Sequence, residues 1–219
     1  MLDPDPVPAK TGTLPEQSQR RRGRSSRRAL TPAELSAWIH DQEGAIAKRW
    51  MGELRSRGER RDPQMDELLE AFLDLLVSFL APGIGPWRTQ VEPLFQQAAE
   101  LFGNLGALRG QAAGEAVEEM QLLREAILRF LFRNPPVRSE GGIGFREMLR
   151  LNRLVDLAVT HASVGHTDAL FFNLLHGTGV SDRPRGEALD EIHAELQHLA
   201  EERDRLFASA EALGLGPGE

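Results

Sequence analysis

Histidines are the first residues in this sequence with the chemistry to hold a metal or a haem iron. His161, His166 and His176 fall within one predicted helix. Two ligands on one helical face stand three or four residues apart, whereas His161 and His166 are separated by five. Either residue is a candidate proximal haem ligand, but ligation also requires a shaped distal pocket. The spacing favours polar or half-buried histidines, so we expect no cofactor and keep a haem-binding protein as an alternative.

A Glu-x-x-His motif occurs at Glu195–His198. Di-iron bundles need two such motifs and further glutamates from two other helices, and this sequence has one copy. We therefore predict no metal site. The glycine-rich stretch at 141–144 lacks the Lys-Ser/Thr ending of a phosphate-binding loop, and no Gly-x-Ser-x-Gly motif occurs. These patterns predict a protein that is not an enzyme. The acidic pair Glu118 and Glu119 is interpreted as an exposed face.

Charge divides the chain into a basic arm and an acidic remainder. The 219 residues carry a net charge of −7 and no cysteine, which suits the reducing cytoplasm. Residues 1–30 contain seven basic and three acidic residues, many prolines and few aliphatic side chains, so we predict a disordered arm. The arm is either a solvated tail or a binding segment for nucleic acid, anionic lipid or an acidic partner. Because the remainder is acidic, nucleic acid is an unfavourable partner for it.

The rest of the sequence has the hydrophobic periodicity of helices. Thr31, Pro32 and Glu34 have the types and spacing of a helix start with a reciprocal capping box. Further helices are predicted over 63–80, 92–105, 112–133 and 145–176, with connecting loops at 82–86 and 135–144. No apolar run has the length that a bilayer crossing requires. We predict an all-α protein in which about five helices form a bundle over residues 31–178.

Three segments of this bundle resemble the N-terminal sensor domain of RsbT co-antagonist proteins (RsbR/RsbRD type), which is similar to domains that precede some bacterial sensor histidine kinases. The residues that carry the resemblance are Trp50, Gly110, Glu115, Glu118, Arg124, Asn152 and Asp156. The stretch 105–109 stands where the family has a histidine-bearing loop. The resemblance implies a helical, in some members globin-like, fold that lacks haem. It also implies a sensor or protein-interaction role in a stress response, with a kinase or a phosphorylatable output protein as the partner.

After a hinge predicted at 179–186, the hydrophobic period tightens to heptads over 187–213, and residues 214–219 form a tail. The seam residues predicted from this period are Leu189, Ile192, Leu196, Leu199, Arg203, Leu206 and Leu213. Such a narrow seam predicts a coiled coil and a homodimer, while a helix folded back on its own bundle is the alternative. Arg203 would be a polar seam residue of the kind that sets register.

Taken together, these patterns predict a non-catalytic, cytoplasmic signalling protein that acts through a partner chain. The alternatives are an adaptor that binds nucleic acid or a partner through its arginine arm, and a haem- or metal-binding helical protein.

Overall fold

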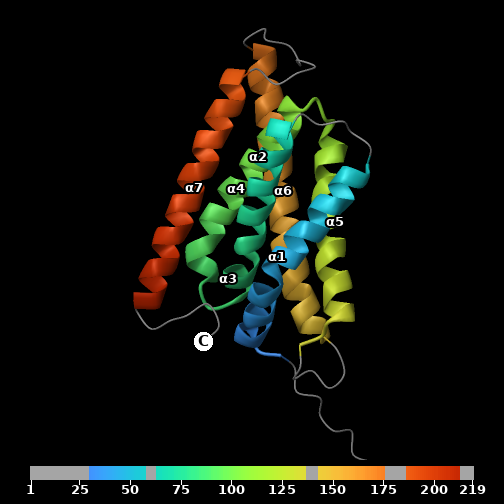
Figure 1. The fold of residues 1–219 in the computed structure, drawn as a ribbon, viewed down its shortest axis with the longest axis vertical. Helices are drawn as coiled ribbons and strands as arrows, with labels where there is room; N and C mark the ends of the chain where they lie inside the picture. Colours follow the sequence, from blue (N-terminus) through green and yellow to red (C-terminus); the bar gives the residue numbers. More distant parts are fainter. Residues whose placement is uncertain (1–29, 58–62, 137–142, 176–185, 213–219) are drawn as a thin grey trace, which may run out of the picture.

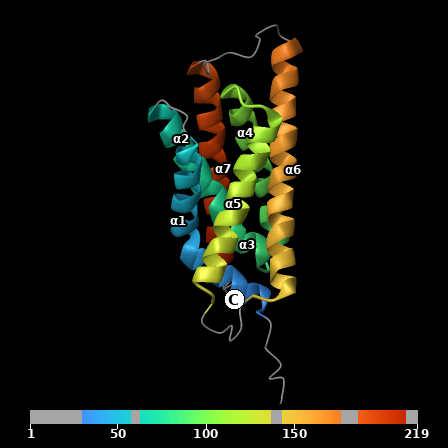
Figure 2. The ribbon, with the colours of Figure 1, turned by 90° about the vertical axis from the view of Figure 1, so that its right-hand side faces the viewer.

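The computed structural model describes residues 30–57, 63–136, 143–175 and 186–212. Its elements are α1 (Pro32–Ser56), α2 (Pro63–Ser78), α3 (Leu80–Ile84), α4 (Arg88–Leu108), α5 (Ala113–Arg133), α6 (Phe145–Leu175) and α7 (Gly186–Ala212). Every described element is a helix, which confirms the all-α prediction. The long helices run side by side as an elongated bundle, with α7 and α5 on opposite sides of it (Figures 1 and 2). The predicted arm at 1–30, except for Leu30, and most of the predicted hinge lie outside the described residues. Leu30 is buried, so its inclusion in a disordered arm was wrong.

The start of α1 has the capping box predicted from its sequence. The backbone N–H of Glu34 donates to the Thr31 hydroxyl at 3.2 Å, and the Glu34 carboxylate accepts from the Thr31 backbone N–H at 2.8 Å. Pro32 occupies the first helical position, where no intrahelical N–H donor is needed. These three residues therefore determine where α1 begins.

Two predicted boundaries are wrong, both near prolines. The predicted loop at 82–86 is largely the short helix α3, because Pro82 lies in the first turn, where its missing N–H costs no hydrogen bond. Helix α4 begins at Arg88 instead of residue 92 and continues through Pro93. Val91 in this added turn is fully buried, so its packing offsets the unfavourable proline.

The centre of the fold is the contact between α4 and α6. A Cβ atom on Gly165 would lie 2.0 Å from the Glu100 carbonyl oxygen, and one on Gly103 would lie 2.0 Å from the Ala162 carbonyl oxygen. Backbone therefore meets backbone at this crossing, which only glycine permits. The same helix α4 carries Phe102, whose ring centroid is 5.8 Å from that of Trp50 in α1.

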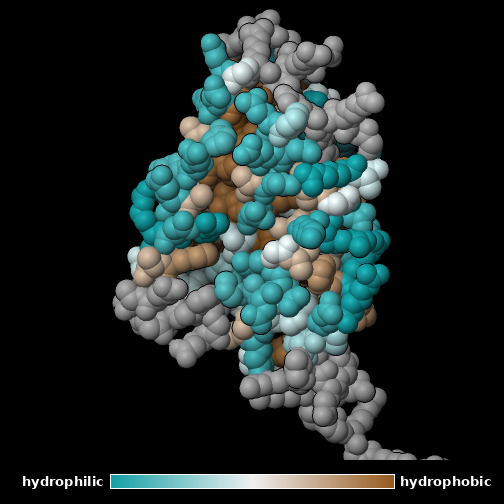
Figure 3. Space-filling view, in the orientation of Figure 1, coloured by the Kyte–Doolittle hydropathy of each residue, from teal (hydrophilic) through white to brown (hydrophobic). Residues whose placement is uncertain are grey.

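Helix α7 lies along the bundle and packs mainly on α4, with a smaller contact on α2. In the described residues the terminal helix therefore contacts the bundle, and the predicted division into a bundle and a coiled-coil helix stays a prediction. Figure 3 shows the molecule from the side seen in Figure 1. This face is mostly hydrophilic, and hydrophobic side chains are visible between α7 and α2, where α4 lies. Within the described residues, no helix combines the length and hydropathy needed to cross a membrane.

Candidate functional site

The predicted seam of α7 is the face that this helix turns toward its own bundle. Ile192, Leu196 and Leu199 are each at most 5% exposed, and Leu189 and Leu206 are half-buried. In this single chain α7 thus has the alternative arrangement, a helix folded back on its own bundle, and pairing of the seam in trans stays a prediction. Leu213 lies outside the described residues.

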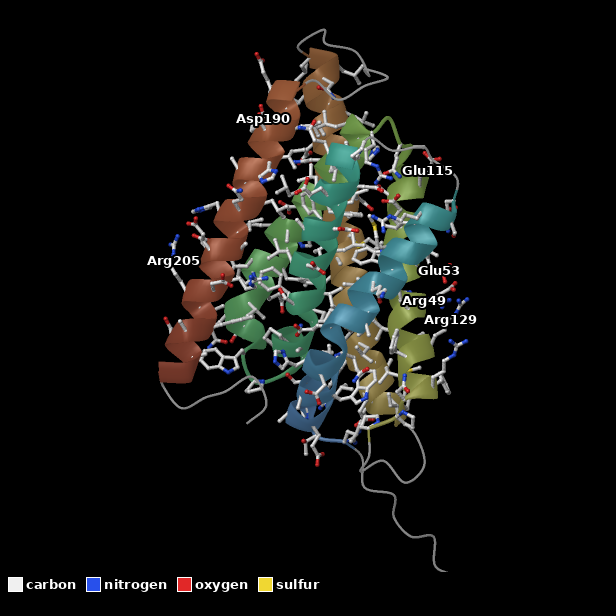
Figure 4. The ribbon with its side chains drawn as sticks, in the orientation of Figure 1. Arg49, Glu53, Glu115, Arg129, Asp190 and Arg205 are labelled. Atoms are coloured by element: carbon white, nitrogen blue, oxygen red, sulfur yellow. The ribbon has the colours of Figure 1, made fainter. Side chains whose placement is uncertain are left out.

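Arg203 is the polar member of the seam and contacts α2. Its Nη1 atom donates to the Ser78 hydroxyl at 3.1 Å, and its Nη2 atom donates to Asp204 at 2.7 Å. Asp190 and Arg205 project from the opposite side of α7, away from the bundle (Figure 4). Helix α7 thus has one face on the bundle and one face in solvent.

The residues that carry the family resemblance lie at helix junctions and helix ends, or along α6. Trp50 is fully buried, and its indole N–H donates to the backbone carbonyl of Glu119 at 2.8 Å, which joins α1 to α5. Glu118 accepts from Arg57 at 2.7 Å on the exposed side of the same junction. Glu115 accepts from the Ala112 backbone N–H at 2.7 Å and caps α5.

The remaining motif residues lie at the end of α4 and along α6. Gly110 has φ +74°, a left-handed conformation that favours glycine, and it terminates α4. The backbone N–H of Gln111 then donates to the Gly106 carbonyl at 3.1 Å, as in a Schellman motif. Arg124 of α5 forms an ion pair with Asp156 of α6, and Asn152 is half-buried one turn before Asp156. Four of the residues that carry the resemblance thus join helices, namely Trp50, Glu118, Arg124 and Asp156, and two others, Gly110 and Glu115, mark helix ends.

Sequence reasoning missed a buried polar network beside this turn. Nη1 and Nη2 of Arg109 each donate to one oxygen of Glu119 at 2.8 Å, and the two side chains are only 5% and 4% exposed. The Gln111 amide donates to the same carboxylate at 2.8 Å. Interpreting Glu119 as an exposed residue was wrong. The available signal was its place between Ala116 and Met120, on the apolar stripe of α5.

The histidines considered as ligands bond to protein atoms. His166 is fully buried, and its Nε2 atom lies 2.8 Å from the Gln111 carbonyl oxygen, so this nitrogen carries the proton. His161 hydrogen-bonds Glu100 at 2.7 Å through Nδ1. His198 lies 3.4 Å from Glu202, and Glu195 is exposed. In the described part of the chain, no group of three or more histidines and acidic residues could hold a metal ion; His176 lies outside it.

A cavity of about 520 Å³ opens at the end of the bundle where α1 begins. Helices α1, α3, α4 and α6 all contribute to its wall, together with the turn that joins α3 to α4. Its charged residues are Arg88, Glu92, Arg150 and Arg153. Arg88 donates to Glu92 at 2.9 Å. Neither Arg150 nor Arg153 forms an ion pair or a side-chain hydrogen bond within the described residues. No prediction from sequence identified this cavity, because four separate segments converge to form it.

Comparisons of this sequence and structure with protein-family models, with curated proteins and with solved structures gave no match.

Proposed function

We propose that this protein is a non-catalytic signalling module, a sensor or protein-interaction domain of a bacterial stress response that acts through a partner chain. The observation that carries the proposal is the position of α7. Its heptad seam is covered by the protein's own bundle, whereas the same spacing suits a partner helix. One face with two competing partners is the basis of a two-state element.

In the proposed mechanism α7 moves between two arrangements. In the first, Leu196 and Leu199 are buried on the bundle and Arg203 bonds Ser78, as described above. In the second, the same seam pairs with α7 of a second copy, and Arg203 sets the register of the pair. Because both arrangements use one face, they exclude each other. A signal that binds one arrangement more tightly than the other shifts the population between them.

The residues that hold the bundle together support a module that moves as a unit. Buried Arg109, Gln111 and Glu119 connect the end of α4 to α5, and Trp50 connects α1 to α5. By contrast, α7 contacts the bundle through an apolar seam, and its Arg203 hydrogen-bonds Ser78 at a half-buried edge of that seam. The family resemblance suggests a kinase or a phosphorylatable output protein as the partner.

The test compares a substitution in the bundle surface that α7 covers with a substitution in the seam of α7 itself. Leu108 of α4 lines a cavity together with Ile192 of α7, so Leu108→Ala weakens the bundle side and leaves the seam intact. We expect this variant to release α7 and to shift the monomer–dimer equilibrium toward dimer by about tenfold, as a loss of about 1.4 kcal/mol implies. Leu199→Ala lies in the seam and should weaken both arrangements, so its dimer should be weaker than that of Leu108→Ala.

Sedimentation equilibrium over a range of protein concentrations measures the change in association. The matched control is Leu128→Ala, a half-buried leucine on α5, on the opposite side of the bundle from α7 (Figure 2). This control should leave the association constant unchanged. A protein that stays monomeric in every variant, or the same shift in Leu108→Ala and Leu128→Ala, would contradict the proposal.

A further inference from the structure

We propose that the cavity lined by Arg88, Arg150 and Arg153 binds a small organic anion with an apolar body. This inference goes beyond the proposed function, and neither depends on the other. It rests on the charge, burial and size of the cavity at the end of the bundle where α1, α3, α4 and α6 meet.

The cationic side of the cavity comes mainly from α6. Arg150 and Arg153 are three residues apart and therefore lie on one face of this helix. Arg150 is half-buried, and a guanidinium in that environment favours an anionic partner, which the described residues do not supply. Arg88 approaches from α4 and is balanced by Glu92 at 2.9 Å. Three arginines against one glutamate make the cavity cationic in a chain whose net charge is −7.

The start of α4 strengthens this positive field. Helix α4 begins at Arg88, which lines the cavity, and its first turn has no side-chain cap and no acidic residue. The first turn of a helix carries backbone N–H groups without intrahelical partners and the positive end of the helix dipole, and both favour an anion. The start of α1 also borders the cavity, but its capping box and the Glu34 carboxylate already occupy it.

The floor of the cavity is apolar and suits the body of an organic molecule. Ile84 of α3, with Leu154 and Leu157 of α6, lines it between the arginines and the core. Leu154 packs tightly on Gly83, where a Cβ atom would lie 3.1 Å from its methyl carbons. A volume of about 520 Å³ falls in the range of small-molecule sites, which is more than inorganic phosphate alone would fill. A carboxylate or a phosphate monoester with a short hydrocarbon chain matches both the cationic side of the cavity and its apolar floor.

Isothermal titration calorimetry of the full chain tests the proposal with octanoate and octyl phosphate, which share a body and differ in the anionic group. Octylamine has the same body with a positive charge, and acetate has the anion without the body. We expect at least one of the two octyl anions to bind, octylamine not to bind, and acetate to bind at least about tenfold more weakly. Whichever octyl anion binds more tightly identifies the preferred head group.

Arg150→Gln and Arg153→Gln should each weaken that binding by about tenfold or more, as the loss of a charge-assisted hydrogen bond implies. The matched control is Arg146→Gln, an exposed arginine one turn earlier on α6 that does not line the cavity. It should bind as tightly as the unchanged protein, and circular dichroism should show the same helical signal for all three variants. Absence of binding by both octyl anions up to about 10 mM would overturn the proposal. So would equal weakening in all three variants, or no weakening by Arg150→Gln and Arg153→Gln.

Discussion

At the scale of single residues, the contrast between Glu118 and Glu119 shows how position on a helix decides what a carboxylate does. Glu118 is exposed and pairs with Arg57 at the surface, while Glu119 is buried and accepts from both Arg109 and Gln111. Surface pairs contribute about 0–1 kcal/mol because water screens them. Removal of one partner from a buried pair leaves an uncompensated charge and costs about 3–5 kcal/mol. Two adjacent residues of the same type therefore have different consequences for stability.

We expect Glu119→Gln to lower the free energy of unfolding by about 3 kcal/mol, because the buried Arg109 guanidinium would lose the charge of the carboxylate that it binds through two hydrogen bonds. Urea denaturation followed by circular dichroism measures the change. Glu118→Gln is the control, with an expected loss of less than about 1 kcal/mol. Equal losses in the two variants would show that Glu119 is not buried as described.

Side-chain roles could be predicted from sequence where the partners are close together in the chain. The Thr31–Glu34 cap was predictable because its partners are three residues apart. A step of one residue turns the chain by about 100°, so the stripe of α5 places Glu119 on its buried face. Its partner Arg109 could not be predicted, because the pairing depends on how the turn at Gly110 directs α5 against α4.

At the scale of elements, the crossing of α4 and α6 depends on two glycines that have no side chain to separate the helices. Gly165 faces the Glu100 carbonyl and Gly103 faces the Ala162 carbonyl. Such backbone contact makes the crossing sensitive to a single methyl group, since neither main chain can turn aside as a flexible side chain would.

Gly165→Ala should lower the free energy of unfolding by at least about 3 kcal/mol, near the upper end of overpacking costs, because its Cβ atom would clash with backbone. Gly44→Ala is the control within a helix interior, since a Cβ atom there meets nothing within 4 Å. It should instead stabilise the protein by about 0.5–1 kcal/mol through helix propensity. Thermal unfolding measures both, and a stabilised Gly165→Ala variant would contradict the close crossing.

The elements themselves were largely predictable, because their ends carry local signals. Helix α5 ends before Pro135 and Pro136, and α6 begins after a glycine-rich stretch, as expected. Helix α3 was missed because five residues are too few for periodicity to show. The cavity beside it was missed for a different reason: Arg88 and Arg150 are far apart in sequence, and only the packing of α4 against α6 brings them together.

At the scale of the whole molecule, α7 decides how much of the bundle is covered. A heptad seam has the same sequence whether its partner is the protein's own bundle or a second copy, so periodicity could not distinguish the two. Coverage by α7 also affects α1. Glu43 of α1 lines a cavity of about 140 Å³ with Phe207 and Ala210 of α7. Burial there raises the pKa of Glu43, although a hydrogen bond from His40 and the nearby charges of His40 and Arg203 oppose the shift.

This raised pKa predicts the pH dependence of a Glu43→Gln variant. A carboxyl group whose pKa is higher in the folded than in the unfolded protein destabilises the fold above the folded pKa, where it is ionised in both states. The cost disappears as the pH falls through the folded pKa toward the unfolded value of 4.5. Glu43→Gln should therefore be more stable than the unchanged protein at pH 7, and the difference should shrink on acidification toward pH 4.5.

Urea denaturation at several pH values measures this difference. The control is Glu67→Gln, an exposed glutamate on α2, whose stability difference from the unchanged protein should vary less over the same range. If the stability difference between Glu43→Gln and the unchanged protein grew on acidification, burial of the Glu43 carboxylate would not be its cause.

The cavity that contains Glu43 also holds Trp87, and the chain has three tryptophans and no tyrosine. Trp50 is fully buried, and Trp38 is 9% exposed with its N–H donated to the Asn134 carbonyl. Trp87 is only half-buried and shares its cavity with Phe207 of α7. Intrinsic fluorescence is thus dominated by two shielded indoles and one whose solvent contact depends on α7. The unlabelled chain carries its own optical reporter: lifting α7 would shift Trp87 emission to longer wavelength and open it to acrylamide quenching.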